Sequence, residues 1–147
     1  MQKFIMTALL IFIPLNSAMG ETASEIENNA QKSFQQELTR CAVFYETMAG
    51  CLSDSDENKQ EFKDLFDVTI NEAIQVGLKV KMTSKEIQEK LLKERTSLIS
   101  DMDGKCVNYQ VIVNNHYVNC VNVTKQGQKR IMYWRHKAQV EAAKKTQ

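Results

Sequence analysis

Four cysteines constrain the fold of this 147-residue sequence more strongly than any other feature. They are Cys41, Cys51, Cys106 and Cys120, with separations of 10, 55 and 14 residues. The count is even, and the spacing lacks the close C-x-x-C pairs of zinc sites and of thioredoxin-like redox sites. The sequence therefore predicts two structural disulfides and no metal site.

The first 20 residues have the three parts of an export signal. Lys3 gives a basic start, residues 4–15 form a mainly apolar run, and small residues occupy positions 18 and 20. A membrane span needs about 20 apolar residues, and this run is too short. We therefore expect a signal peptide over 1–20, cleaved after Gly20. The mature protein is then periplasmic or secreted, where thiols are oxidised to disulfides.

The remaining residues are enough for one hydrophobic core, and thus for one domain. Hydrophobic residues make up 43% of the sequence, with only 5 Gly and 1 Pro, which favours helices and argues against disorder. The 19 basic and 18 acidic residues nearly cancel, so bulk charge predicts no nucleic-acid partner.

Three segments carry apolar residues at every third or fourth position, which is the pattern of amphipathic helices. Capping boxes, in which a hydroxyl and a carboxylate satisfy the first backbone N–H groups, mark two of the starts. The predicted helices run from Ser24 and Glu27 to Gly50, from Ser53 or Asp54 to Val80, and from Thr83 and Glu86 to Asp103-Gly104.

Residues 106–124 fit two structures. Valines alternate with polar residues, and Asn114-Asn115 could turn a β-hairpin. In that hairpin, however, Cys106 and Cys120 face other residues and cannot bridge each other. On a helix they lie 14 residues apart, close to four turns, and share one face. The helix is our prediction, and the hairpin remains the alternative.

An up-down-up-down bundle makes the first and fourth helices antiparallel neighbours. This arrangement pairs Cys41 with Cys120 and Cys51 with Cys106. A bridge from Cys41 to Cys51 is excluded within a helix, because 10 residues rise about 15 Å and a disulfide needs Cα atoms within about 7 Å. The crossed pairing would require parallel segments. The predicted fold is all-α: a small disulfide-stapled bundle of about four helices over 21–124.

Charge is distributed unevenly along the chain. Residues 21–75 carry 12 acidic and 4 basic side chains, and residues 76–147 carry 6 acidic and 14 basic ones. One interpretation is intramolecular complementarity, with acidic helices packed beside basic ones. The other is a basic end that faces a partner.

The basic amphipathic segment 125–147 is the candidate contact surface. It has seven basic residues and one acid, with the only tryptophan, and one face of its predicted helix is apolar. Such a helix can fold onto the bundle, bind a protein groove, or bind an anionic membrane surface. The candidate contact residues are Lys129, Arg130, Tyr133, Trp134, Arg135 and Lys137.

No catalytic motif is present: H-E-x-x-H, G-x-S-x-G and a Gly-rich phosphate loop are all missing. His116 and His136 have no evident partner in the sequence. We therefore expect no enzyme, no cofactor and no small-molecule substrate. The leading hypothesis is an exported interaction protein with an unknown protein partner. The alternatives are a membrane-surface protein acting through the basic tail and, third, a small cell-wall hydrolase.

Overall fold

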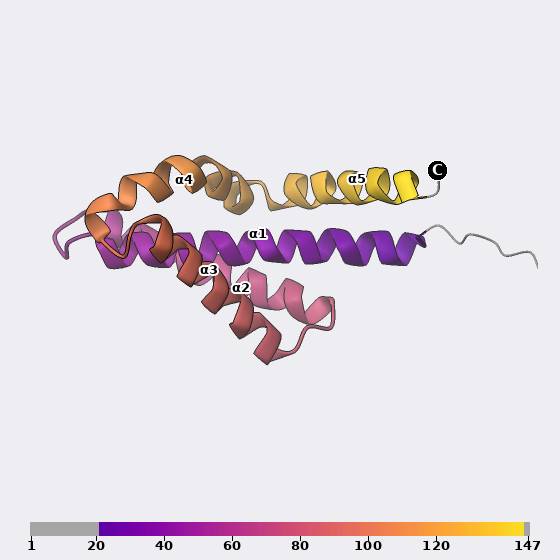
Figure 1. Ribbon diagram of the computed structural model, residues 1–147, viewed down its shortest axis with the longest axis horizontal. Helices are drawn as coiled ribbons and strands as arrows, with labels where there is room; N and C mark the ends of the chain where they lie inside the picture. The colour runs from indigo at the N-terminus through magenta and orange to yellow at the C-terminus, as the bar shows by residue number, and fades with distance from the viewer. Residues whose placement is uncertain (1–20, 146–147) are drawn as a thin grey trace, which may run out of the picture.

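The computed structural model describes residues 21–145, and the predicted signal peptide lies outside the described residues. This part of the chain is all-α (Figure 1). Its elements are α1 (Ala23–Cys51), α2 (Asn58–Lys79), α3 (Ser84–Asp101), a 3-10 turn η1 (Cys106–Asn108), α4 (Tyr109–Lys125) and α5 (Gly127–Lys145). The predicted disulfide-stapled helical bundle is confirmed.

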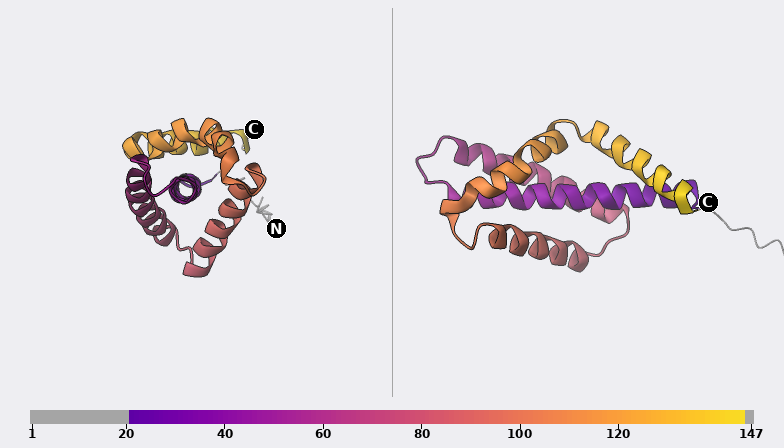
Figure 2. Two further views of the ribbon diagram at one scale, coloured as in Figure 1. Left: turned by 90° about the vertical axis from the view of Figure 1, so that its left-hand side faces the viewer. Right: turned by 45° about the horizontal axis from the view of Figure 1, so that its top comes forward.

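The long helix α1 is the centre of the bundle. It contacts all four other helices, and Figure 2 shows it end-on with the others around it. Five consecutive residues, from Cys41 to Tyr45, are fully buried, as expected of a helix that is covered on every side. The helices α1 to α4 alternate in direction, and α5 continues the direction of α4 along α1 (Figure 1). The predicted tail therefore packs on the bundle core.

One disulfide joins α1 to α4, and the other joins the end of α1 to η1. Cys41 pairs with Cys120 and Cys51 pairs with Cys106, each with a Cα–Cα distance of 5.1 Å. This is the pairing that antiparallel neighbours predict. The surroundings differ, because Cys41 and Cys120 are fully buried whereas Cys106 is exposed.

Residues 106–124 form η1 and most of α4, so the helical prediction is confirmed and the hairpin is wrong. Valine and asparagine are weak helix formers. The helix is stabilised by its packing instead: Ile112, Cys120 and Val123 are buried against the core.

Two predicted helix starts are wrong by a few residues. The first capping box uses Thr22 and Glu25 and not Ser24 and Glu27. The second helix begins at Asn58, later than the predicted Ser53 or Asp54.

The late start of α2 has a local cause. The Asp56 carboxylate accepts the backbone N–H of Asn58 at 2.9 Å and ends a turn that follows α1. Lys59 Nζ bonds the carbonyl of Leu52 at 3.0 Å and the carboxylate of Asp54 at 2.7 Å. These bonds pair polar backbone groups of residues 52–58 outside a helix, so the turn is stable without helical hydrogen bonds.

The start and end of α3 agree with the sequence prediction. Thr83 and Glu86 form the predicted capping box. At the other end, Asp103 and Gly104 have φ angles of 52° and 68°, and the Gly104 N–H bonds the carbonyl of Ile99 at 2.9 Å. A left-handed residue closing the helix in this way is a common C-terminal motif.

Candidate functional site

The predicted contact segment docks on α1 through its apolar face. Ile131, Ala138 and Ala142 of α5 are buried there, and Trp134 is half-buried. The two helices run side by side with opposite directions (Figure 1). Part of the predicted contact segment is thus buried within the bundle and is not available to a partner or a membrane.

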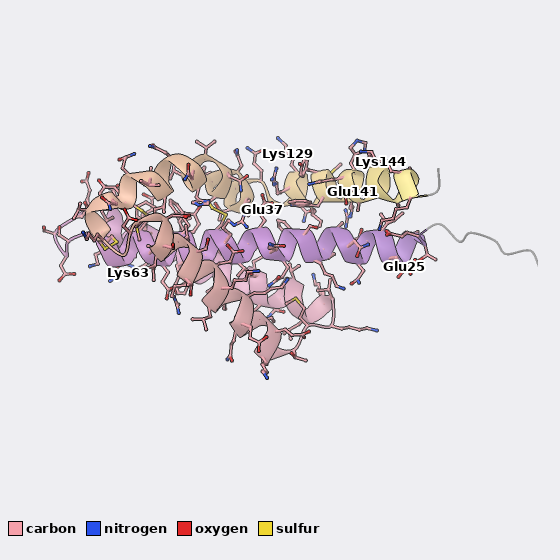
Figure 3. The ribbon with its side chains drawn as sticks, viewed as in Figure 1. Glu25, Glu37, Lys63, Lys129, Glu141 and Lys144 are labelled. Atoms are coloured by element: carbon pink, nitrogen blue, oxygen red, sulfur yellow. A yellow bond between two sulfur atoms is a disulfide. The ribbon has the colours of Figure 1, made fainter. Side chains whose placement is uncertain are left out.

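Glu37 of α1 connects three helices. Its carboxylate accepts the Trp134 indole N–H at 2.8 Å and the Arg130 Nε–H at 2.7 Å, both from α5. Asn119 of α4 donates a further bond at 3.0 Å. The Glu37 side chain is only 8% exposed, so these bonds lie in a shielded environment where unpaired charge is costly. Figure 3 labels Glu37 between α1 and the C-terminal helices.

Two opposed effects act on the pKa of Glu37. Burial raises it, because the charged carboxylate loses hydration. The hydrogen bonds from Arg130, Trp134 and Asn119 lower it by more, and the net pKa lies below the ordinary value. Glu37 is therefore an ionised structural carboxylate and not a proton donor at neutral pH.

A second carboxylate of α1 binds α5 further along the helix. Arg135 donates two bonds to Glu27, at 2.7 and 2.9 Å. Close to the ends of the described chain, Lys145 pairs with Glu21. Arg130 and Arg135 are therefore used inside the molecule.

The other three candidates face solvent. Lys129, Tyr133 and Lys137 are exposed on α5, and Figure 3 labels Lys129 on the side of α5 away from α1. The Tyr133 ring stacks edge-on against Trp134, with 5.2 Å between ring centroids, and Lys137 Nζ lies 4.9 Å from the Trp134 ring centroid. Sequence periodicity identified the apolar face of this helix but not the carboxylates that bind its arginines.

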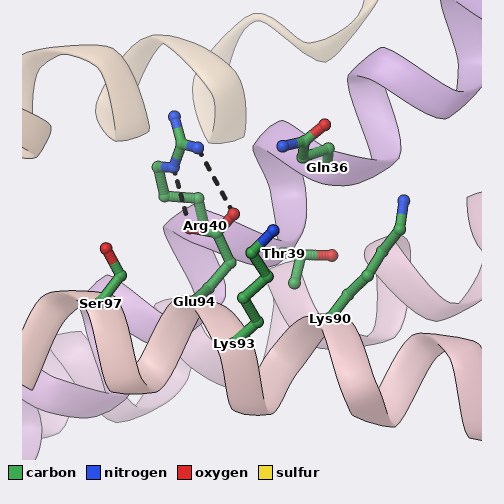
Figure 4. Close-up of a pocket in the computed structure, with 7 residues that line it drawn as sticks. All are labelled: Gln36, Thr39, Arg40, Lys90, Lys93, Glu94 and Ser97. Carbon is green, nitrogen blue, oxygen red and sulfur yellow. Dashed lines mark hydrogen bonds and ion pairs between the residues drawn. The ribbon is translucent and has the colours of Figure 1, made fainter.

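A cleft of about 380 Å³ lies between α1 and α3 (Figure 4). Arg40 spans it and binds Glu94 with bonds of 3.0 and 3.4 Å. Lys90 donates to the side-chain amide oxygen of the buried Gln35 at 3.2 Å. Because two of its three cations are already bonded within the protein, this basic cleft offers little free charge to an anion.

A second cleft, of about 310 Å³, lies between α2 and α4 with α1 as its floor. Sequence analysis missed it, because its walls come from three separate segments. Its lining is aromatic and aliphatic, with polar groups at the rim: Tyr45, Met48, Leu52, Asp56, Asn58, Glu61, Phe62, Leu65, Tyr109, Tyr117, Val121, Thr124 and Lys125.

Within residues 21–145, neither histidine side chain makes a hydrogen bond or an ion pair. His116 is half-buried 6.2 Å from the Phe44 ring, and burial lowers its pKa, with Arg40 adding to the shift. His136 is exposed on α5. In the same residues, no three His, Cys, Asp or Glu side chains are grouped to hold a metal ion.

The outward face of α4 carries a stripe of uncharged side chains. Val111 and Val118 are 44% and 72% exposed, and the exposed Asn114 and Asn122 lie on the same face; Val107, in η1 just before the helix, is 82% exposed and extends the stripe. We call these five residues the valine stripe. Residues 106–124 contain no Asp, Glu, Lys or Arg, so the stripe is free of charge along almost the whole helix.

No known family model matches the chain, and no curated protein or solved structure is significantly similar to it. Within the described residues, none of the helices is long and apolar enough to span a membrane. The two disulfides are compatible with an extracellular or periplasmic protein. The class of protein that the fold defines is an all-α, disulfide-stapled bundle.

Proposed function

We propose that this chain is an exported, non-enzymatic module that binds another protein through the valine stripe of α4. The N-terminal export pattern and the two disulfides support the export. The valine stripe carries the binding proposal, because the other exposed helix faces are rich in charge.

The composition of the stripe matches the centre of a protein interface. Interface cores are depleted in charged residues, whereas free surfaces are not. Val107 and Val118 are the two most exposed large apolar residues of the described chain, and both belong to the stripe. The stripe has no charge to pair, so the partner surface is expected to be apolar and uncharged as well. Disulfides fix Cys106 in η1 and Cys120 in α4 to α1, and a stripe held in this way loses less entropy on binding.

A site-specific photo-crosslinker at Val118 tests the proposal in the native compartment. We expect one discrete adduct, which disappears when Val111→Asp is added to the same chain. The matched control is the crosslinker at Leu92, which is 61% exposed on α3 among charged neighbours. Equal adducts from both positions, or an adduct that survives Val111→Asp, would contradict the proposal. A second copy of this chain as the crosslinked species would make the stripe a self-association surface.

The membrane-surface alternative has weaker support. Ile131 is buried against α1, and the Trp134 indole bonds Glu37, so the apolar face of α5 is used within the bundle. Insertion would have to break those contacts first. Vesicle binding tests this: if deletion of residues 125–147 leaves binding to anionic vesicles unchanged, the tail has no such role.

A further inference from the structure

The cleft between α2 and α4 has features of a ligand site that the proposed protein-binding role does not use. Both helices pack on α1, and they touch each other little, which leaves the cleft open between them. Its volume of about 310 Å³ is at the small end of the range for ligand pockets. The cleft and the valine stripe lie on different faces of α4, because Tyr117 and Val118 are adjacent in the helix and point about 100° apart.

Aromatic rings form much of the wall. Three of the four tyrosines of the chain, Tyr45, Tyr109 and Tyr117, line this one cleft together with Phe62. The rings of Tyr45 and Phe62 lie 6.1 Å apart between centroids. The faces of such rings carry partial negative charge and attract cations.

The charged groups at the rim of the cleft also favour a cation. Asp56 and Glu61 are acidic, and Lys125 is the only base in the lining. In the described chain, Glu61 makes no ion pair or hydrogen bond through its side chain, so its carboxylate is free to meet a ligand. Burial raises the pKa of Tyr45, its hydrogen bond with Thr124 opposes the rise, and the nearby Tyr117 and Glu61 add to it.

We propose that this cleft binds a small organic cation, an ammonium or quaternary ammonium group on a short apolar body. The ammonium group lies against the exposed ring of Tyr117 with Glu61 as its counter-ion, and the apolar body packs on the aliphatic wall that includes Leu65 and Val121. The Tyr45 hydroxyl already bonds Thr124 at 3.3 Å, so the floor of the site is preformed.

Choline and its uncharged carbon isostere, 3,3-dimethyl-1-butanol, are probes that separate charge from shape. In protein with isotope-labelled tyrosines, NMR titration should show saturable shifts of Tyr45 and Tyr117 with choline. We expect the isostere to bind about tenfold more weakly, because it lacks the cation–π and carboxylate attraction. Equal binding of the two probes, or no saturable shift with choline, would overturn the proposal.

Paired variants assign the effect to the cleft. Glu61→Gln and Tyr117→Leu should each weaken choline binding about three- to tenfold. The matched controls are Asp64→Asn, an exposed acid on α2 outside the cleft, and Tyr133→Leu, a tyrosine on α5 with 48% exposure against 45% for Tyr117. Controls that weaken binding as much as the cleft variants would show general surface attraction and refute the site. All four positions are exposed, so the variants should fold, and circular dichroism checks this.

Discussion

The two halves of the bundle are held to α1 by different means. The first half, by which we mean the helix α2, packs on α1 through apolar side chains such as Phe66, Ala73 and Val76. Within residues 21–145, no ion pair joins α2 to α1. The second half comprises α3 to α5 with η1. Two disulfides join it to α1, and five ion pairs join it to residues 21–46.

The difference follows from the sign of the charge along the chain. Residues 21–75, which include α1 and most of α2, have 12 acidic and 4 basic side chains, so these two helices have few opposite charges to pair. The later residues are mainly basic and supply the arginines that bind Glu27, Glu37 and Glu46. Four ion pairs between acids of the early segment and bases of the later one support the interpretation of intramolecular complementarity, and all four involve helices α3 to α5. The first half depends on hydrophobic burial.

The largest expected effect is loss of a disulfide. On the chain-entropy model, bridges that close loops of 79 and 55 residues each contribute about 4 kcal/mol. Cys41→Ala/Cys120→Ala should cost at least about 1 kcal/mol more than Cys51→Ala/Cys106→Ala, because only the first pair leaves a cavity in the core. Urea unfolding of the two double variants measures the difference.

Stepwise reduction provides an independent check on the same pair. With increasing thiol reductant, alkylation and mass spectrometry should detect Cys106 before Cys120, since Cys106 is exposed and Cys120 is 1% exposed. Equal stability losses together with simultaneous reduction would mean that burial does not distinguish the bridges.

The second effect concerns the ion pairs of the later half. Glu37→Gln should lower the free energy of unfolding by about 2–3 kcal/mol, because it leaves Arg130 without its counter-charge in a shielded site. Glu46→Gln is the matched control: Glu46 also binds an arginine, Arg95, but both side chains are more than a third exposed. There we expect less than about 1 kcal/mol. Similar losses at both sites would contradict the role of burial.

The third effect is the response to acid. The folded-state pKa of Glu37 is below its ordinary value of 4.5, so the unfolded chain takes up the proton first. Its stabilisation is therefore complete above pH 4.5 and is lost as the pH falls through the folded-state pKa. Glu72 acts in the opposite sense, because burial raises its pKa.

Chemical unfolding from neutral pH into this acidic range measures the acid response. We expect the wild type to lose stability more steeply than Glu37→Gln, which lacks the titrating carboxylate. Parallel curves would show that Glu37 does not contribute to acid sensitivity.

The smallest effect tests the apolar half. Thr69 of α2 is fully buried, and within residues 21–145 its hydroxyl is the single buried side-chain oxygen or nitrogen without a hydrogen-bond partner. Thr69→Val should raise the melting temperature, with a gain of about 1 kcal/mol, because the methyl group needs no partner. The control is Thr39→Val. Thr39 is also fully buried, but its hydroxyl is bonded to Gln35, so this variant should lower the free energy of unfolding by about 1 kcal/mol. A loss at both positions would show that the Thr69 hydroxyl is satisfied.

Sequence patterns predicted features that depend on short spacing. Helical periodicity identified the helical segments, the Thr83–Glu86 cap identified the start of α3, and cysteine spacing with helix geometry identified both disulfides. The start of α2 was not predictable in this way. Ser53, Asp54 and Asp56 are all capping residue types, but the N-cap of α2 is Glu57 and has no side-chain cap bond, while the Asp56 carboxylate is used in the turn after α1.

The sequence by itself determined the helical segments, because helix periodicity is a local constraint, and it predicted the disulfide pairing once the first and fourth helices were taken as antiparallel neighbours. Only the tertiary structure placed α1 at the centre, bound Arg130 and Trp134 to Glu37 across 93 and 97 residues, and left the valine stripe of α4 exposed. It also brought Tyr45, Phe62 and Tyr117 to one cleft. Which face of an amphipathic helix meets which neighbour depends on the packing of all five helices together, and no segment encodes that choice alone.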